Sequence, residues 1–142
     1  MLRDLGDASG EAYALNCQGI LDSATGDYPA AAASLRQAVA IFGDLRIPYE
    51  QAEALNNLGG LLSLASDSRQ ARDHHVQALA IARDIGAPLQ EARALEGIGQ
   101  SRIQEGNPAD AATPLREALT IYQRIGAPGA QRVQQTLRQH GL

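Results

Sequence analysis

The sequence repeats itself every forty residues without a gap. Residues 12–51 and 52–91 are identical at fifteen of forty aligned positions. Because the shared positions are unevenly spaced, the match is not low-complexity sequence. Such a period indicates a stack of similar units, each burying its apolar face against its neighbours. Eight positions agree in all three copies: Ala12, Ala14, Leu15, Gly19, Ala31, Ala38, Ile41 and Pro48, each recurring forty and eighty residues later.

Each unit has the pattern of two helices. Apolar residues recur at helical spacing, as at Ala31, Leu35, Ala38 and Ile41. Turn residues separate the two helices, and a proline after a linker ends each unit by pushing its predecessor into an extended state. The predicted first helices are residues 11–24, 50–65 and 90–105. The predicted second helices are residues 28–44, 69–84 and 108–124, followed by a last helix over 130–140.

Composition agrees with an all-α fold. The 142 residues include 26 alanines and 18 leucines, whereas aromatic residues make up only 4%. Alanine has the best helix propensity and lets helices approach closely. A β-sandwich or barrel would favour Val, Ile, Thr and aromatic residues instead. The recurring Ala and Gly positions are expected where the two helices of a hairpin cross.

These residues resemble the tetratricopeptide repeat, with Leu15, Gly19, Ala31, Ala38 and Pro48 at the family's positions. The longer period resembles the variety found in kinesin light chains, Leu-Gly-Asn-repeat adaptors and bacterial regulators. The resemblance implies an all-α, right-handed superhelix of three helix-turn-helix repeats with a C-terminal capping helix. The chain departs from the pattern at a few positions: Gln18 for leucine; Asp22, Leu62 and Arg102 for tyrosine; and His75 for an apolar residue.

The repeat also predicts the domain organisation. The expected segments are a remnant of a preceding repeat and linker at 1–10, repeats at 11–49, 50–89 and 90–128, and a capping helix with tail at 129–142. Residues 1–6 align with 81–86, the end of a second helix. The chain is therefore interpreted as a piece of a longer array, with a naturally short protein as the alternative.

Charge and cysteine content limit the cellular compartments and the classes of partner that we expect for this chain. The net charge is −4, and all twelve basic residues are arginines scattered among sixteen acids. Nucleic-acid-binding domains usually carry a cluster of Lys and Arg, and this sequence has none, so direct binding of DNA or RNA is not expected. The sequence has no long apolar run for a membrane span and a single cysteine, Cys17. These features predict a cytoplasmic protein, and the Arg- and Ala-rich usage fits a bacterial source.

No constellation of catalytic or metal-binding residues emerges. His74 and His75 are adjacent and point about 100° apart on a helix, so they do not face one metal ion. His75 is expected in a core position and His74 at the surface. Cys17 lacks a neighbouring base, and Gly59-Gly60 lacks the residues of a phosphate loop. The prediction is a non-enzyme with no metal and no cofactor.

The candidate site is the concave groove that the resemblance implies, lined by the first helices of successive repeats. Asn16 and Asn56 recur at one position, where an amide would grip the backbone of an extended peptide, or would simply be a tolerated polar residue. Tyr13 is the expected apolar anchor, with Ile20 beside it, and Arg93 would pair with an acidic group. The predicted groove positions are Tyr13, Asn16, Ile20, Ser23, Glu53, Asn56, Gly60, Ser63, Arg93, Glu96, Gln100 and Ile103.

Three functions remain open. The first is a scaffold that binds a protein or peptide in the groove, within a larger bacterial signalling or transcription regulator. The second is a sensor of a small molecule or signalling peptide. The third is a homo-oligomer formed through the exposed end faces. A chaperone-type carboxylate clamp is disfavoured, because lysine is absent and Glu53 and Glu96 would repel the ligand.

Overall fold

The structure, a computed structural model, describes residues 5–142, and this part of the chain is built from helices without a strand. The prediction of an all-α helical solenoid is confirmed. The helices are α1 (Leu5–Ala24), α2 (Tyr28–Asp44), α3 (Pro48–Leu64), α4 (Ser68–Ile85), α5 (Pro88–Gln104), α6 (Pro108–Ile125) and α7 (Gly129–Gln139).

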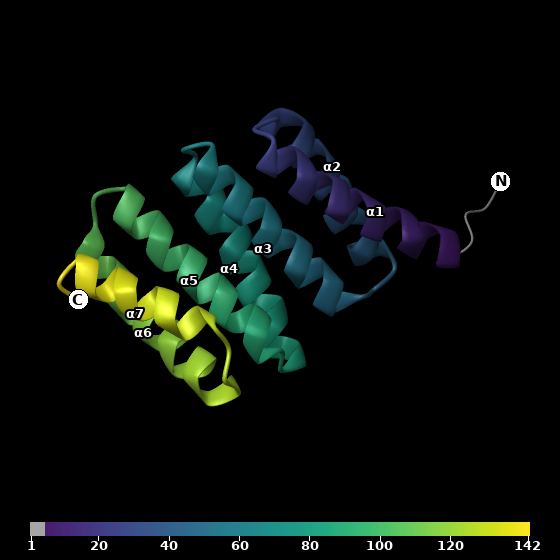
Figure 1. Cartoon of the computed structure of the whole chain (residues 1–142). Coiled ribbons are helices and arrows are strands. Elements are labelled where there is room, and N and C mark those ends of the chain that lie inside the picture. The colour runs from purple at the N-terminus through teal and green to yellow at the C-terminus, as the bar shows by residue number, and fades with distance from the viewer. Residues whose placement is uncertain (1–4) are drawn as a thin grey trace.

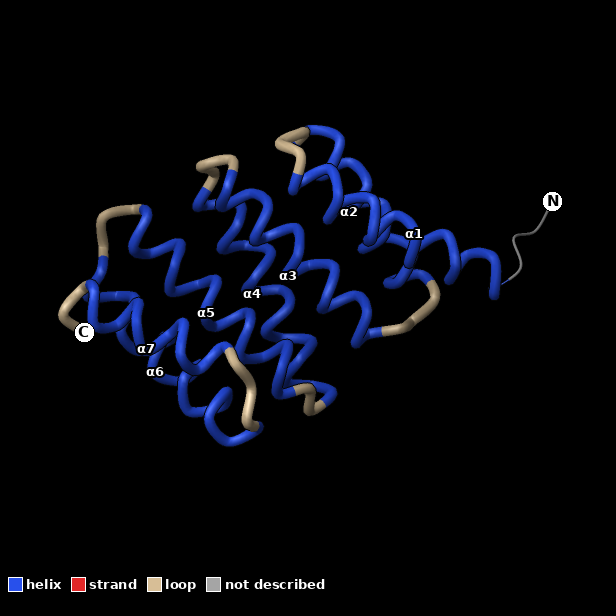
Figure 2. The backbone as a smooth tube through the Cα atoms, viewed as in Figure 1, coloured by secondary structure: helices blue, strands red, loops and turns tan. Residues whose placement is uncertain are grey.

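The helices form two layers of a stack. Helices α1, α3 and α5 each pair with the even-numbered helix that follows, and each even-numbered helix also packs on the next odd-numbered one. The odd-numbered helices lie in the layer facing the viewer in Figure 1, with α1 and α7 at opposite ends of the stack. Short connections alternate between its two edges (Figure 2). This arrangement places α1, α3, α5 and α7 along one face.

Glycines allow the two helices of each pair to approach closely. A Cβ atom built on the shared glycine of each first helix would lie 2.5–2.6 Å from a side chain of the second helix. The shared alanines Ala31 and Ala38 are fully buried, as are their equivalents. Small residues at the helix crossings are therefore a packing requirement of this fold. The three close pairs are Gly19 with Leu35, Gly59 with His75, and Gly99 with Leu115.

Several helices begin earlier than the sequence predicted. Pro48 and Pro88 are the first residues of α3 and α5 instead of the last residues of a linker, and the residues before them have non-helical backbone angles. Helix α1 begins at Leu5 instead of residue 11. Ala8 stands where the other repeats have proline, so nothing in the sequence forces a break there. The part of the predicted remnant at residues 1–4 lies outside the described residues.

The turns within and between repeats use left-handed residues. Asp27 and Asp67 cap α2 and α4 by accepting hydrogen bonds from backbone N–H groups, at 3.3 and 3.2 Å. Asn107 forms no such side-chain bond at the start of α6. Ser66 (φ +64°) and Arg46 (φ +56°) have positive φ angles at positions where the other repeats have glycine. These two residues therefore carry a conformational cost that their equivalents avoid.

Helix α7 closes the C-terminal end of the stack. Val133 and Leu137 are buried in a cluster with residues of α5 and α6, including Leu115. Gly129 lies against the ring of Tyr122, 2.7 Å from where its own Cβ would be. The opposite face of α7 is polar and rich in glutamine.

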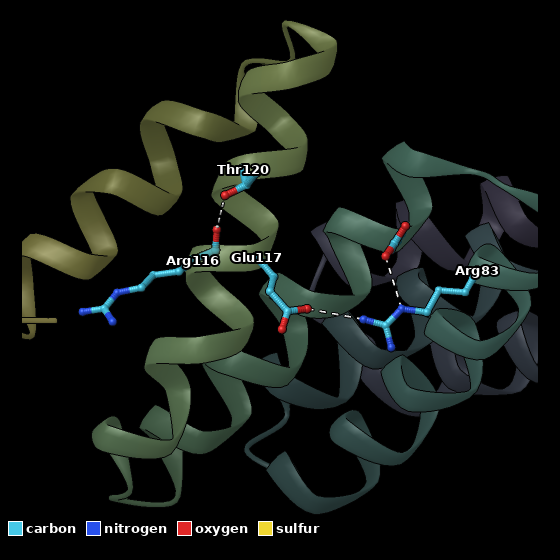
Figure 3. A network of polar contacts seen from close by, with 5 residues as sticks. Arg83, Arg116, Glu117 and Thr120 are labelled. Carbon is cyan, nitrogen blue, oxygen red and sulfur yellow. Dashed lines mark hydrogen bonds and ion pairs between the residues drawn. The ribbon is translucent and has the colours of Figure 1, made fainter.

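An ion-pair network ties three helices together on the side of the stack formed by α4 and α6. Arg83 of α4 donates to Glu91 of α5 at 3.2 Å and to Glu117 of α6 at 3.3 Å (Figure 3). The Arg83 and Glu117 side chains are half exposed, so this network adds little stability. Nowhere from residue 5 onward is a helix both long and apolar enough to span a bilayer.

Candidate groove site

A hollow opens on the face formed by the odd-numbered helices. It has two adjoining open compartments of about 560 Å³ and about 210 Å³, which share Asn56, Gly60, Arg93, Glu96 and Arg132. We call this space the groove hollow. Its other lining residues that matter below are Ile20 and Ser23 of α1, Asn57, Leu61, Ser63 and Leu64 of α3, His75 of α4, and Gly97 and Gln100 of α5.

Most of the predicted groove residues meet in this hollow, but some do not. The residues brought together are Ile20, Ser23, Asn56, Gly60, Ser63, Arg93, Glu96 and Gln100. Tyr13, Asn16, Glu53 and Ile103 do not line it. Tyr13 packs edge-on against Phe42, with ring centroids 5.2 Å apart, and remains 45% exposed. Burial, with the nearby charges of Glu50 and Glu53, raises the Tyr13 pKa. Ile103 packs against the core near α7.

Asn56 is buried and fixed by three hydrogen bonds. Its Nδ2 donates to the backbone oxygen of Gln90 at 3.1 Å and to Gln90 Oε1 at 3.0 Å. Its Oδ1 therefore faces His75 Nδ1 at 2.9 Å, and the histidine donates. Both N–H groups of the amide are used inside the domain. Asn56 thus offers a ligand only the remaining lone pair of its oxygen, which differs from the predicted grip on a peptide backbone.

Arg93 is held between two neutral amides. Its Nη1 donates to Gln90 Oε1 at 3.1 Å and its Nη2 to Asn57 Oδ1 at 2.8 Å. Asn57 Nδ2 in turn donates to Asn16 Oδ1 at 3.0 Å, so the buried Asn16 anchors this chain of bonds on α1. The network fixes the position of the Arg93 guanidinium at the hollow's edge.

Glu96 is neutralised by residues from outside the first helices. Its carboxylate accepts from Arg132 Nε and Nη2 of α7 at 2.6 and 2.7 Å, and from the Tyr122 hydroxyl at 2.8 Å. Hydrogen bonding to Glu96 raises the Arg132 pKa, while burial and the Glu96 charge raise the Tyr122 pKa. Glu96 is 8% exposed and fully paired, so it does not give the hollow the repulsive charge that the sequence suggested.

His75 is a buried neutral residue at the floor of the smaller compartment. Its ring is clamped between Gly59 and Gly97, where an added Cβ atom would lie 2.5 and 2.3 Å from Nε2, respectively. Burial, followed by the charges of Arg93 and His74, lowers the pKa of His75 to about 4. The predicted core position of His75 is confirmed.

His74, in contrast, is half-buried instead of exposed at the surface. Its Nδ1 has no hydrogen-bond partner among the described residues. Burial, with the nearby Arg36, lowers the His74 pKa.

The sequence did not reveal three of the residues that shape the hollow. Asn57 stands where the other repeats have Cys17 and Gly97, so no repeat signal marks it. Gln90 precedes the recurring pattern of its helix, and its equivalent in the second repeat is Glu50. Arg132 lies in the last helix, outside the first helices that were expected to line the groove. Within residues 5–142, no group of His, Cys, Asp and Glu is arranged to hold a metal ion.

Comparison with known proteins gives a family. A tetratricopeptide repeat model matches residues 50–124, which is more than half of the chain and spans α3 to α6. The chain belongs to the tetratricopeptide repeat family, whose members generally mediate protein–protein interactions. The α1–α2 pair, outside the matched range, shows the same close Gly–Leu crossing. A search of curated proteins finds no match.

Proposed function

We propose that this chain is a non-catalytic interaction module that binds a segment of a partner protein in the groove hollow. One observation carries the proposal: side chains of α1, α3, α5 and α7 converge on an open hollow that mixes apolar and polar groups. Stacked repeats characteristically bind along their extended concave surfaces. The mixed lining suits a peptide, which presents both backbone polar groups and apolar side chains.

Gly60 provides a direct test of this site. A Cβ on Gly60 would meet nothing within 4 Å, so a larger side chain enters the hollow and not the core. Gly10 of α1 is also helical with open space around it, and it lies outside the hollow. Gly60→Leu and Gly10→Leu are therefore a matched pair in which only the first obstructs the proposed site.

The experiment is a selection of random peptides displayed on phage against the wild-type domain. The proposal expects enriched peptides that lose binding to Gly60→Leu and keep binding to Gly10→Leu. Circular dichroism of both variants checks that they remain folded. Peptides that bind all three proteins equally, or a selection that enriches no peptide, would contradict the proposal.

The wider setting belongs to the same proposal. A net charge of −4 and the absence of lysine suit a cytoplasmic bacterial signalling or transcription regulator that contacts proteins and not nucleic acid directly. A small-molecule sensor is the second candidate, because about 560 Å³ falls within the usual range of ligand pockets. Self-association through the end faces would appear as a concentration-dependent mass in light scattering.

A further inference from the structure

Arg93 and Arg132 both line the groove hollow, but only Arg132 has a carboxylate beside it. Arg132 is matched by the Glu96 carboxylate. Arg93 forms no ion pair within the described part of the chain, and both of its acceptors are neutral amide oxygens. Since Glu96 is already paired, the positive charge of Arg93 dominates this part of the groove. A partly buried charge without a counter-charge favours an anionic ligand.

The geometry of Arg93 also leaves room for that ligand. A guanidinium has five N–H groups, and the two hydrogen bonds to Gln90 and Asn57 use one each on Nη1 and Nη2. The remaining N–H groups suffice for a carboxylate, which arginine binds through two parallel hydrogen bonds. The neutral amides of Gln90 and Asn57 hold the guanidinium in place without cancelling its charge. The site is thus preorganised for a single anion.

An apolar surface adjoins this cation. Ile20 of α1 and Leu64 of α3 line the larger compartment together with Arg93, and they are 49% and 62% exposed. Gly60 leaves open space between α1 and α5, because it has no side chain to fill it. An apolar side chain of a ligand would remove Ile20 and Leu64 from water while filling that space.

These observations define one kind of partner, and the inference rests on the function proposed above. We propose that the groove hollow binds an extended peptide through an acidic side chain paired with Arg93 and a neighbouring apolar side chain placed over Gly60 against Ile20 and Leu64. An internal acidic residue fits better than a chain end. The compartment that Arg93 lines is also lined by residues of α1, α3 and α7, so the groove surface extends beyond the guanidinium. A nucleic acid would need several cations along its backbone, and this hollow provides one uncompensated charge.

The test uses synthetic versions of the peptides selected above. One fluorescent peptide carrying Glu or Asp next to an apolar residue is compared with its Glu→Gln or Asp→Asn form, both with amidated C-termini. Fluorescence anisotropy against the wild-type domain should show about a tenfold weaker affinity for the neutral peptide. The affinity of the acidic peptide should also fall with added salt.

Protein variants assign this difference to Arg93. With Arg93→Gln the acidic and neutral peptides should bind within about twofold of each other, while Arg93→Lys should keep part of the preference. Arg116→Gln is the matched control, because Arg116 is an exposed arginine of α6 outside the hollow. It should leave the tenfold preference unchanged. Since the peptide substitution is made on the wild-type protein, the test does not depend on how well Arg93→Gln folds.

The outcomes separate the two proposals. Peptides that are blocked by Gly60→Leu but bind equally well in acidic and neutral form would overturn this inference and leave the groove site standing. A preference that persists in Arg93→Gln, or that requires a free C-terminal carboxylate, would also overturn it. Peptides unaffected by Gly60→Leu would overturn the groove site itself.

Discussion

Two neighbouring glycines of α3 should respond to the same substitution in opposite ways. At Gly59 a Cβ would lie 2.5 Å from His75 Nε2 and 2.7 Å from two ring carbons. The ring has no free direction in which to move, because Gly97 lies on it and Nδ1 is bonded to Asn56 at 2.9 Å. At Gly60 a Cβ would meet nothing within 4 Å. Replacing either glycine by alanine raises the helix propensity of α3 equally, but only the alanine at position 59 would meet a neighbouring side chain.

The magnitudes follow from these contacts. Replacing glycine by alanine within a helix stabilises it by about 1 kcal/mol. Overpacking at Gly59 costs about 1–3 kcal/mol, and displacing the buried His75–Asn56 hydrogen bond costs about 1–3 kcal/mol more. Gly59→Ala should therefore destabilise the domain by about 3 kcal/mol, whereas Gly60→Ala should stabilise it by up to about 1 kcal/mol. Thermal unfolding followed by circular dichroism should separate the two midpoints by about 10 °C.

A double-mutant cycle tests the stated cause. In a His75→Ala background the obstructing ring is gone, so adding Gly59→Ala should no longer destabilise the domain. The reasoning would be refuted if Gly59→Ala were as stable as the wild type. It would equally be refuted if the penalty persisted without the histidine ring, because the clash would then not be its source.

Three further predictions concern backbone strain, pH and the contact between Glu96 and α7. Arg46→Gly and Ser66→Gly should each raise stability in urea unfolding by up to about 1 kcal/mol, because both residues have positive φ angles; unchanged stability would show that the turns are not strained. His75 has a folded pKa of about 4 against 6.5 unfolded, so the unfolded chain binds more protons between these values. The free energy of unfolding should therefore fall by about 3 kcal/mol as the pH drops from 7 to 4. The charges of Arg93 and His74 oppose protonation of His75, whereas the charge of Glu96 favours it. His75→Leu should make stability less dependent on pH, and an unchanged pH dependence would exclude His75 as the source. Glu96→Ala should cost about 2 kcal/mol, because the Tyr122 hydroxyl and Arg132 lose their acceptor; faster amide exchange confined to α7 and its contacts would identify the released helix, and exchange that stays as slow as in the wild type would contradict this role.

The repeat allowed most of the fold to be predicted, because the same packing problem is solved three times. Gly19, Gly59 and Gly99 were expected at helix crossings, and each lies against the large side chain of its partner helix. The start of α1 was not predicted from the alignment of repeats. Position 8 is alanine, whereas the equivalent positions 48 and 88 are the prolines that begin α3 and α5. Without a proline, the start of α1 depends on the helix propensity of the local sequence.

The site was harder to predict because identical residues have different partners. Asn16 and Asn56 occupy one repeat position, yet only Asn56 meets a histidine, since the equivalent of His75 in the first repeat is Leu35. Gln90 likewise replaces Glu50. The hydrogen-bond partners of these asparagines come from neighbouring helices, at positions where the repeats differ in sequence. Periodicity therefore predicts where a groove residue lies but not which of its polar groups remain for a ligand.

The charge of the groove is the clearest case of this limit. Glu96 alone predicts repulsion of an acidic ligand when only the residues of the first helices are considered. Tyr122 and Arg132, whose equivalents in earlier repeats include Ala82 and Ala92, bind the Glu96 carboxylate, and the charge of Arg132 balances it. Arg93, bound only by neutral amides, is then the charge that a partner meets. The proposed binding of an acidic peptide therefore depends on α7 as well as on Arg93, so disrupting the Arg132–Glu96 pair should weaken that binding even with Arg93 intact.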